Sequence, residues 1–387
     1  MQKNELLKLK AIDYNEKGLA VCKEDSFVIF VPQMLKDEVA EVRLEKVNAS
    51  YGFGKIVDLI EDSVDRRQAD CPIYHQCGGC QLQHMSYAHQ LEFKKKHVES
   101  LFQRGLNQSD LFVEGIEGMD DPHRYRNKSI VPFNHEGEYG FFRAHSHDIV
   151  PFESCLIQSE EADQILAFIQ NFYQQNHLSF ENLRNVLIKK GFNSQEIMVV
   201  LIVRKAKCAL KEEFIQAITQ RFNHIKSIQL NINNNDDNVV LGKEYKLLFG
   251  KDTINDSLDG LLFEISAASF YQVNPIQTVK LYQKAIEYAQ LTEKDSVLDL
   301  YCGIGTISLF AARHAKKVIG IEVVKEAIED AKRNAELNHL TNLEFICGDA
   351  KDIFSDLKNT KLDVILVDPP RKGLSPQTIS NITDLNP

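Results

Sequence analysis

The sequence has 387 residues and a formal charge of −10 at pH 7, so a nucleic-acid partner would need a locally basic face. Its 43% hydrophobic and 26% charged residues are typical of a soluble globular protein of two or three domains. The longest strongly apolar run, 197–203, is far too short to cross a membrane. Eight cysteines and a charged first stretch without an apolar leader indicate the cytoplasm, where thiols are core residues or metal ligands.

Residues 1–62 are predicted to form a small β-barrel. Short β-rich runs separated by turn residues cover 18–21, 27–31, 38–47 and 54–60. The pattern fits an OB-like barrel, which is a common nucleic-acid platform, and it fits a generic barrel without an RNA role equally well. The segment resembles the TRAM domain found at the front of several RNA-modifying enzymes.

A cysteine cluster follows, with Cys71, Cys77 and Cys80 in the spacing C-x5-C-x2-C. Three thiols within ten residues indicate a ligand set, although three unrelated buried thiols would give the same pattern. Zinc completed by His84 is one possibility, since zinc favours tetrahedral Cys/His sites. An iron–sulfur cluster is the other, and because it prefers four thiolates it would need a distant cysteine, for which Cys155 is the natural candidate. The cysteines within apolar runs are expected in the core: Cys22, Cys208 and Cys347.

Residues 63–262 are predicted to form an α+β central domain with helices over 161–175 and 211–221 and no catalytic constellation. Its segment 122–147 combines basic residues with aromatic rings, so that cations could hold phosphates while rings stack on unpaired bases. A hairpin whose rings belong to the core is the alternative. The basic residues are the candidate RNA contacts: Arg124, Arg126, Lys128 and Arg143. The interleaved aromatic residues are Tyr125, Phe133, Tyr139, Phe141 and Phe142.

The last part, 263–387, contains a short apolar strand at 297–300 that runs into Gly303 and Gly305 and then into a helix over 307–314. Strand, glycine-rich turn and helix together predict a nucleotide-type pocket at the carboxyl end of a parallel sheet. Further strands end at polar residues, namely Glu322, Asp349 and Asp368. A carboxylate at the position of Glu322 can accept both ribose hydroxyls, and one at the position of Asp349 can meet an adenine edge.

Asp299-Leu-Tyr-Cys-Gly303 together with Glu322, Asp349 and Asp368-Pro-Pro resembles a class I S-adenosylmethionine methyltransferase, an α/β Rossmann-like fold. NAD binding is the alternative. The missing third glycine of G-x-G-x-x-G, where the sequence has Ser308, counts against it.

The cysteine cluster, a lone cysteine about 75 residues further on and the Phe270-x-Gln272-x-Asn274 element resemble the bacterial 23S rRNA (uracil-5-)-methyltransferases over nearly the whole chain. Radical S-adenosylmethionine enzymes usually space their cysteines differently. The resemblance implies a [4Fe–4S] cluster on Cys71, Cys77, Cys80 and Cys155, and a monomer acting on an unpaired or flipped-out uridine of large-subunit rRNA. It also implies S-adenosylmethionine bound by a set of seven residues: Gln272, Tyr301, Gly303, Gly305, Glu322, Asp349 and Asp368.

In that family a cysteine thiolate adds to uracil C6, C5 attacks the sulfonium methyl, and a base removes the C5 proton. The resemblance places this cysteine, in an S-C-N-P element, and the basic glutamate after Pro387, with Asp368 a possible uracil contact. We therefore expect a truncated chain that binds RNA and cofactor without turnover, its fourth strand left at an exposed sheet edge. A tRNA uracil-5 methyltransferase and a non-catalytic iron–sulfur RNA-binding protein with a degenerate methyltransferase fold remain as alternatives.

Overall fold

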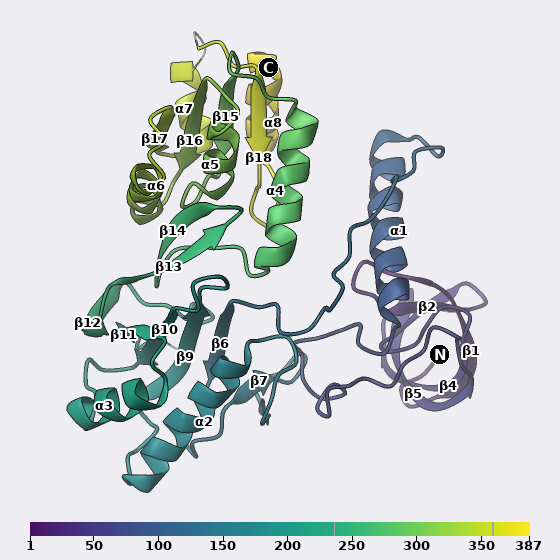
Figure 1. Ribbon diagram of the computed structural model, residues 1–387. Helices are drawn as coiled ribbons and strands as arrows, with labels where there is room; N and C mark the ends of the chain where they lie inside the picture. The colour runs from purple at the N-terminus through teal and green to yellow at the C-terminus, as the bar shows by residue number, and fades with distance from the viewer. Residues whose placement is uncertain (236, 358–359) are drawn as a thin grey trace. The chain divides into compact units, whose positions relative to one another are not determined.

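The computed structural model describes residues 1–235, 237–357 and 360–387. The chain divides into two compact units, which are described separately (Figure 1). Unit 1 comprises Met1–Asp120 and Phe141–Phe152, and unit 2 comprises Asp121–Gly140 and Glu153–Pro387. The predicted three-domain division stays a prediction. Within the described ranges, no helix has the length and apolar composition that a membrane span needs.

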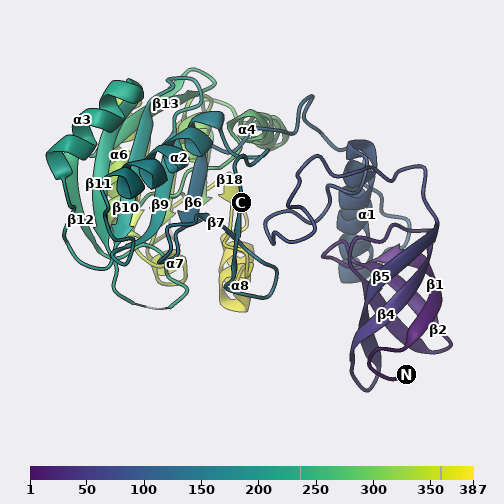
Figure 2. The ribbon, with the colours of Figure 1, turned by 90° about the horizontal axis from the view of Figure 1, so that it is seen from below.

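Unit 1 begins with a closed barrel of five strands in the order β1-β2-β3-β5-β4, seen from the side in Figure 2. The strands are β1 (Leu6–Tyr14), β2 (Ala20–Glu24), β3 (Phe27–Val31), β4 (Val39–Val47) and β5 (Tyr51–Glu61). Leu9, Ile29 and Val42 point into the barrel and are fully buried, while alternate residues face outward. The predicted barrel is confirmed. The sequence patterns missed β1, because Lys8 and Lys10 interrupt its apolar residues.

The rest of unit 1 is a long connection with one helix and one hairpin. Its elements are α1 (Tyr87–Leu106), β7 (Gly140–Phe142) and β8 (Ile149–Pro151). Ser86 caps α1 by accepting the His89 N–H at 3.2 Å. After the barrel, Arg66 donates from Nε and Nη2 to the two carboxylate oxygens of the buried Glu38, both at 2.5 Å, which ties the connection to the barrel.

Unit 2 contains a five-stranded sheet in the order β12-β11-β10-β9-β6, with β10 and β11 parallel and the other pairs antiparallel. Its elements are β6 (Lys128–Pro132), α2 (Glu160–Gln175), β9 (Leu183–Lys190), β10 (Ile197–Val203), α3 (Lys211–Arg221), β11 (Ile225–Ile232) and β12 (Glu244–Gly250). β10 is buried along its whole length, as its uninterrupted apolar sequence requires.

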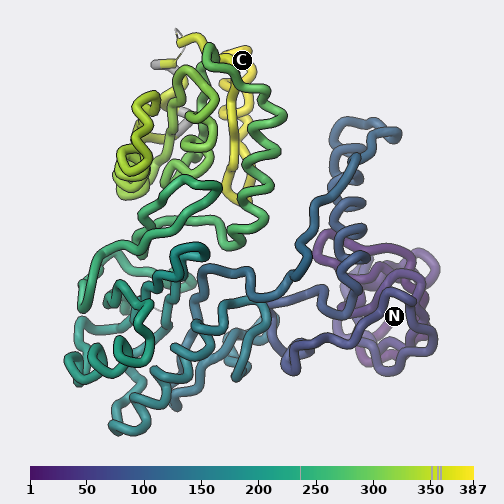
Figure 3. The backbone as a smooth tube through the Cα atoms, viewed as in Figure 1, coloured from purple at the N-terminus to yellow at the C-terminus, as the bar shows by residue number. Residues whose placement is uncertain are grey.

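A hairpin and a four-stranded parallel sheet complete unit 2; Figure 3 traces this path. The hairpin is β13 (Thr253–Leu258) and β14 (Leu261–Ser266), and α4 (Pro275–Ala289) follows it. The parallel sheet and its helices are β15 (Ser296–Leu300), α5 (Thr306–Ala312), β16 (Lys317–Glu322), α6 (Lys325–Leu337), β17 (Leu343–Cys347), α7 (Ala350–Leu357), β18 (Val364–Val367) and α8 (Pro376–Leu385). The sheet order is β17-β16-β15-β18, so β18 forms one edge as expected.

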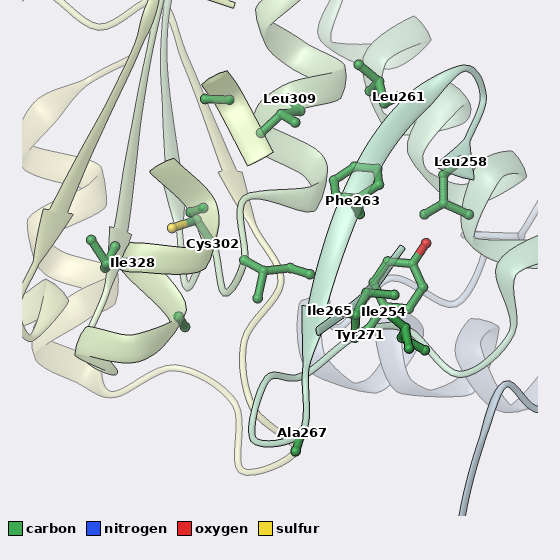
Figure 4. Packing of buried hydrophobic residues seen from close by; sticks show 14 of the residues in the cluster. Ile254, Leu258, Leu261, Phe263, Ile265, Ala267, Tyr271, Cys302, Leu309 and Ile328 are labelled. Carbon is green, nitrogen blue, oxygen red and sulfur yellow. The ribbon is translucent and has the colours of Figure 1, made fainter. Parts of the chain in front are cut away.

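One hydrophobic cluster runs through unit 2 from the five-stranded sheet to the parallel sheet (Figure 4). Met198 and Val200 of β10 lie at one end of this cluster, and Ile304 and Leu309 beside the glycine-rich turn lie at the other. The hairpin supplies the middle with five buried residues: Ile254, Leu258, Leu261, Phe263 and Ile265. The hairpin therefore packs against the five-stranded sheet and against α6, which in turn packs on the parallel sheet.

Candidate functional site

The candidate site lies at the carboxyl edge of the parallel sheet. The order β17-β16-β15-β18 reverses direction between β15 and β18, and open α/β sheets bind ligands at such a switch point. β15 ends at Leu300 and β18 at Val367, and these two residues are partners in the ladder. The residues that follow each strand therefore meet at this edge.

The turn after β15 leaves its backbone open to a ligand. Tyr301, Gly303 and Gly305 have φ values of 67°, 55° and 81°, a left-handed conformation that favours glycine. A Cβ added to Gly303 would meet nothing within 4 Å, so a ligand can approach that backbone closely. At Gly305 a Cβ would meet Phe345 at 3.0 Å, so this glycine is required for packing at the start of α5.

Glu322 ends β16 with its carboxylate held in one orientation. Oε2 accepts the Gly303 N–H at 3.3 Å, and Oε1 accepts the Val324 N–H at 3.0 Å. The Glu322 carbonyl accepts the Gly348 N–H at 2.9 Å, which brings Asp349, exposed after β17, to the same edge. A fixed, half-exposed carboxylate of this kind suits a pair of vicinal hydroxyls.

Gln272 reaches the edge from the segment before α4. Its Nε2 donates to Asp368 Oδ2 at 2.9 Å, directly after β18. Its backbone is fixed by Asn127, whose Nδ2 donates to the Gln272 carbonyl at 2.9 Å and whose N–H donates to the Val273 carbonyl at 3.0 Å. The buried Tyr282 of α4 also hydrogen-bonds the Gln272 side chain, and burial raises the pKa of its phenol. The sequence patterns did not indicate that Asn127 or Tyr282 contributes to this site.

Asp299, inside β15, is the fully buried carboxylate of the site. Ser308 of α5 donates to its Oδ2, and no described atom donates to Oδ1. Burial, with the nearby Asp368 and Glu322 charges, raises the pKa of Asp299 to about 7. The interior position of Asp299 therefore favours its neutral form relative to an exposed aspartate.

Lys189 of β9 is a second buried group that the sequence patterns missed. Its Nζ donates to the carbonyls of Ser266 and Ser269, both at 2.7 Å, and fixes the turn between β14 and Gln272. Burial holds the pKa of Lys189 well below its usual range. A lysine inside a strand gives no local pattern that would reveal such a role.

The seven predicted cofactor residues therefore gather around one edge of unit 2. Gln272 and Asp368 are in direct contact, as are Gly303 and Glu322, and Asp349 follows a strand that is bonded to β16. Their role in binding a cofactor stays a prediction.

The predicted metal ligands are separated between the two units, with Cys71, Cys77 and Cys80 in unit 1 and Cys155 in unit 2. All four cysteines are half-buried, and the Gly79 N–H approaches Cys77 Sγ at 3.3 Å. Within the described ranges, no three His, Cys, Asp or Glu side chains lie close enough together to hold a metal ion. The donor chemistry of four thiols fits an iron–sulfur cluster.

His84, the alternative zinc ligand, is only 2% exposed. Its Nδ1 lies 2.6 Å from the Tyr74 hydroxyl, which also donates to the Gln81 carbonyl, and its Nε2 has no hydrogen-bond partner among the described atoms. Burial lowers the pKa of His84 to about 4, so the ring is neutral at pH 7.

The core prediction for the remaining cysteines is confirmed for one of the three. Cys22 is fully buried in the barrel. Cys208 is half-buried, and Cys347 is exposed, so the prediction was wrong for Cys347. Cys347 is the last residue of β17, which is an edge strand of the parallel sheet.

The predicted RNA contacts belong to both compact units. Arg124 Nη1 donates to Asp163 Oδ2 at 2.6 Å and to the Cys155 carbonyl at 2.7 Å, so its guanidinium holds the loop before α2. Arg126 and Lys128 are half-buried, and burial lowers the pKa of Lys128. Arg143 belongs to unit 1, is exposed, and donates to Gln76 Oε1 at 3.2 Å. Phe133 and Tyr139 are buried and pack on each other, which favours the hairpin-core alternative for these two rings.

Comparison with known proteins decides the family. The sequence model of the tRNA (uracil-5-)-methyltransferase family matches residues 86–386. An uncharacterized RNA methyltransferase of Halalkalibacterium halodurans is 41% identical over 401 residues, covering 100% of this chain and 87% of the relative. The chain belongs to this RNA uracil-5 methyltransferase family. An uncharacterized RNA methyltransferase of Bacillus cereus is 42% identical over 399 residues, again covering 100% of this chain and 87% of the relative.

The methyltransferase fold is also found in a solved structure. Pyrococcus abyssi tRNA (uracil-54, C5)-methyltransferase in complex with S-adenosyl-L-homocysteine superposes with a TM-score of 0.77 and 23% identity, over 98% of this chain and 88% of that one. The fold predicted for this family member, a β-barrel followed by a Rossmann-like α/β methyltransferase fold, is confirmed.

Proposed function

We propose that the protein transfers a methyl group from S-adenosylmethionine to C5 of a uridine in 23S rRNA. The observation that carries the proposal is the contact of Gln272 Nε2 with Asp368 Oδ2 at 2.9 Å. It joins two predicted cofactor residues at the switch point of a parallel sheet, in a chain of the RNA uracil-5 methyltransferase family.

Each residue at this edge has its own role in binding. Glu322, oriented by two backbone N–H groups, accepts the ribose hydroxyls, and Asp349 meets the adenine edge. The open backbone at Gly303 allows the ligand to approach. S-adenosylmethionine, when bound, supplies an electrophilic methyl group on a sulfonium. Asp368 and Gln272 hold the reacting end and face the target base.

Uracil C5 needs activation, because it is a weak nucleophile. A cysteine thiolate that adds to C6 makes C5 enolate-like; after methyl transfer a base takes the C5 proton, and the thiolate leaves. Cys302 is unsuited to this role, since it is 5% exposed and burial raises the pKa of its thiol. Residues 1–387 contain no S-C-N-P element, and we propose no other cysteine among them for this step.

We also propose a [4Fe–4S] cluster on Cys71, Cys77, Cys80 and Cys155, with a structural role by default. The C-x5-C-x2-C spacing and the half-burial of all four thiols support it. The resemblance connects this cluster with 23S rRNA enzymes, which is why we favour rRNA. Anaerobic purification should give about four irons per chain, lost in Cys155→Ala and kept in Cys208→Ala. One zinc per chain that survives Cys155→Ala would contradict the cluster.

A tRNA substrate is the second candidate. The matching family is described by its tRNA activity, and the Pyrococcus abyssi enzyme acts on tRNA. Full-length protein should be incubated with labelled methyl donor and either 23S rRNA or tRNA transcripts, followed by nucleoside analysis for 5-methyluridine. Label in rRNA alone supports the proposal, and label in tRNA alone replaces it with the second candidate. No 5-methyluridine in either would leave the non-catalytic RNA-binding alternative.

A further inference from the structure

Lys189 lies on the face of β9 that is turned toward the hydrophobic cluster of unit 2. It is 3% exposed, and its ladder partner on β10 is Met198. Met198 and Leu187, which is two residues earlier on the same face of β9, both belong to the cluster. An apolar residue would fill this position at a lower desolvation cost than a lysine. Packing therefore does not account for the amine, and its hydrogen bonds have to be considered.

The Lys189 amine holds one short stretch of chain, residues 266–273, here called the 266–273 segment. Its Nζ donates to the Ser266 carbonyl and to the Ser269 carbonyl, both at 2.7 Å. Ser269 Oγ donates to the Ser266 carbonyl at 3.0 Å, so the turn is bonded both internally and to β9. Burial, together with the nearby charge of Lys128, lowers the pKa of Lys189 and favours the neutral amine. The two N–H groups of a neutral amine match the two carbonyls.

Asp330 of α6 holds the same turn from another element. Ser266 Oγ donates to Asp330 Oδ2 at 2.9 Å, and the Ser269 N–H donates to Ser266 Oγ at 3.3 Å. Asp330 is buried, and α6 contacts β16, the strand that ends in Glu322. Through Lys189 and Asp330, the turn is therefore bonded to both layers of unit 2.

The 266–273 segment is also held at its far end, around Gln272. The Tyr271 hydroxyl donates to Asp256 Oδ2 of β13 at 3.4 Å, and the Tyr271 ring is buried in the hydrophobic cluster (Figure 4). Asn127 donates to the carbonyls of the last two residues of the segment. The backbone is therefore fixed on both sides of Gln272.

We propose that Lys189 is a positioning residue, which sets the Gln272 amide against Asp368 for cofactor binding and methyl transfer. Lys189 acts through the backbone of the 266–273 segment, because its hydrogen bonds go to carbonyls there. A displacement of about 1 Å is enough to weaken a contact that depends on orientation. This inference rests on the proposed role of Gln272 in holding S-adenosylmethionine.

The test is a double-mutant cycle on the full chain, with S-adenosylhomocysteine as the probe. Lys189→Met removes the donors and keeps a long unbranched side chain. It should weaken binding by about 3- to 10-fold alone, and by less than about 1.5-fold beside Gln272→Ala. Lys189→Gln, which keeps N–H donors on a shorter side chain, should lose less affinity. Lys190→Met is the matched control and should bind normally, because the Lys190 side chain pairs with Glu161 of α2 at 2.7 Å.

Amide hydrogen exchange of the 266–273 segment, measured by mass spectrometry without cofactor, is the second readout. Lys189→Met should accelerate exchange in this segment by at least about tenfold, whereas Lys190→Met should leave it unchanged. If Lys189→Met does not fold, both measurements use Lys189→Gln, for which the same dependence on Gln272 is expected.

Wild-type affinity in the folded Lys189 variant, or an equal loss with and without Gln272, would overturn the proposal, because Lys189 would then not act through Gln272. Unchanged exchange in the 266–273 segment would also overturn it. If the wild-type protein did not bind S-adenosylhomocysteine, the proposed function would fail, and the exchange measurement would still decide whether Lys189 positions the segment.

Discussion

The side chains of Gln272 and Asp368 are hydrogen-bonded across 2.9 Å although 96 positions separate them in the sequence. One precedes α4 and the other follows β18, the edge strand of the parallel sheet. The hydrogen bond therefore joins two segments that border the candidate site. Asn127, from before β6, fixes the Gln272 backbone, so three distant segments determine the position of one amide.

We predict that Gln272→Ala and Asp368→Asn each weaken S-adenosylhomocysteine binding by about tenfold, since each removes a partner of a side-chain pair at the ligand edge. Isothermal titration of both variants and of the double variant would measure the coupling. Gln283→Ala, an exposed glutamine of α4, is the control and should bind normally. Additive losses would show that the two side chains act independently.

The raised pKa of Asp299 predicts that its contribution to the free energy of unfolding decreases as pH rises. Its folded pKa is raised to about 7 while the unfolded value stays near 3.8, so between these values the folded state binds more protons. Stability should therefore fall as pH rises through this window, with a slope of up to about 1.4 kcal/mol per pH unit from this group. Urea unfolding of Asp299→Asn should show a shallower fall from pH 4.5 to 7.5, whereas Asp384→Asn on the exposed face of α8 should follow the wild type.

Arg124 is predicted to stabilise the folded protein. Replacing it with methionine removes the contacts to Asp163 Oδ2 and to the Cys155 carbonyl and leaves a nearly buried carboxylate without its cationic partner. We expect a loss of about 2–3 kcal/mol in the free energy of unfolding. Arg143→Met, at an exposed position, should stay within about 0.5 kcal/mol. If Arg124→Met left stability unchanged and lowered only RNA affinity, the RNA-contact prediction would be the better account.

Thiol reactivity should distinguish Cys302 from Cys347. Cys302 is 5% exposed with a raised pKa, whereas Cys347 is exposed at the end of β17. Native alkylation with iodoacetamide, followed by peptide mass spectrometry, should label Cys347 at least about tenfold faster, because the thiolate is the reactive form. Rapid labelling of Cys302 would reopen its candidacy as a nucleophile.

Local patterns were sufficient to predict much of unit 2. The parallel strands are short apolar runs that end in glycine or an acid, so their type and their functional ends follow from the sequence. The ranges 161–175 and 211–221 were predicted as helices and form α2 and α3. β1 was missed because lysines occupy exposed positions of this half-buried strand, so its apolar residues do not form a continuous run.

The partners within the site could not be predicted in the same way. Asn127, Lys189 and Tyr282 each act through a contact with a segment far away in the sequence. A polar residue in a strand or helix looks the same whether it faces water or a buried carbonyl. Only the fold shows which of these residues is turned away from solvent and bonded to a specific partner.

The hydrophobic cluster through β13 and β14 also has a consequence for folding. Because the buried residues of β13 and β14 share one cluster with residues of β10, α5 and α6, loosening either layer of unit 2 exposes apolar surface of that cluster. The two sheets are therefore expected to melt in one cooperative transition. Cutting the chain before Phe263 would expose apolar surface of this cluster on both fragments, which we expect to lower their solubility.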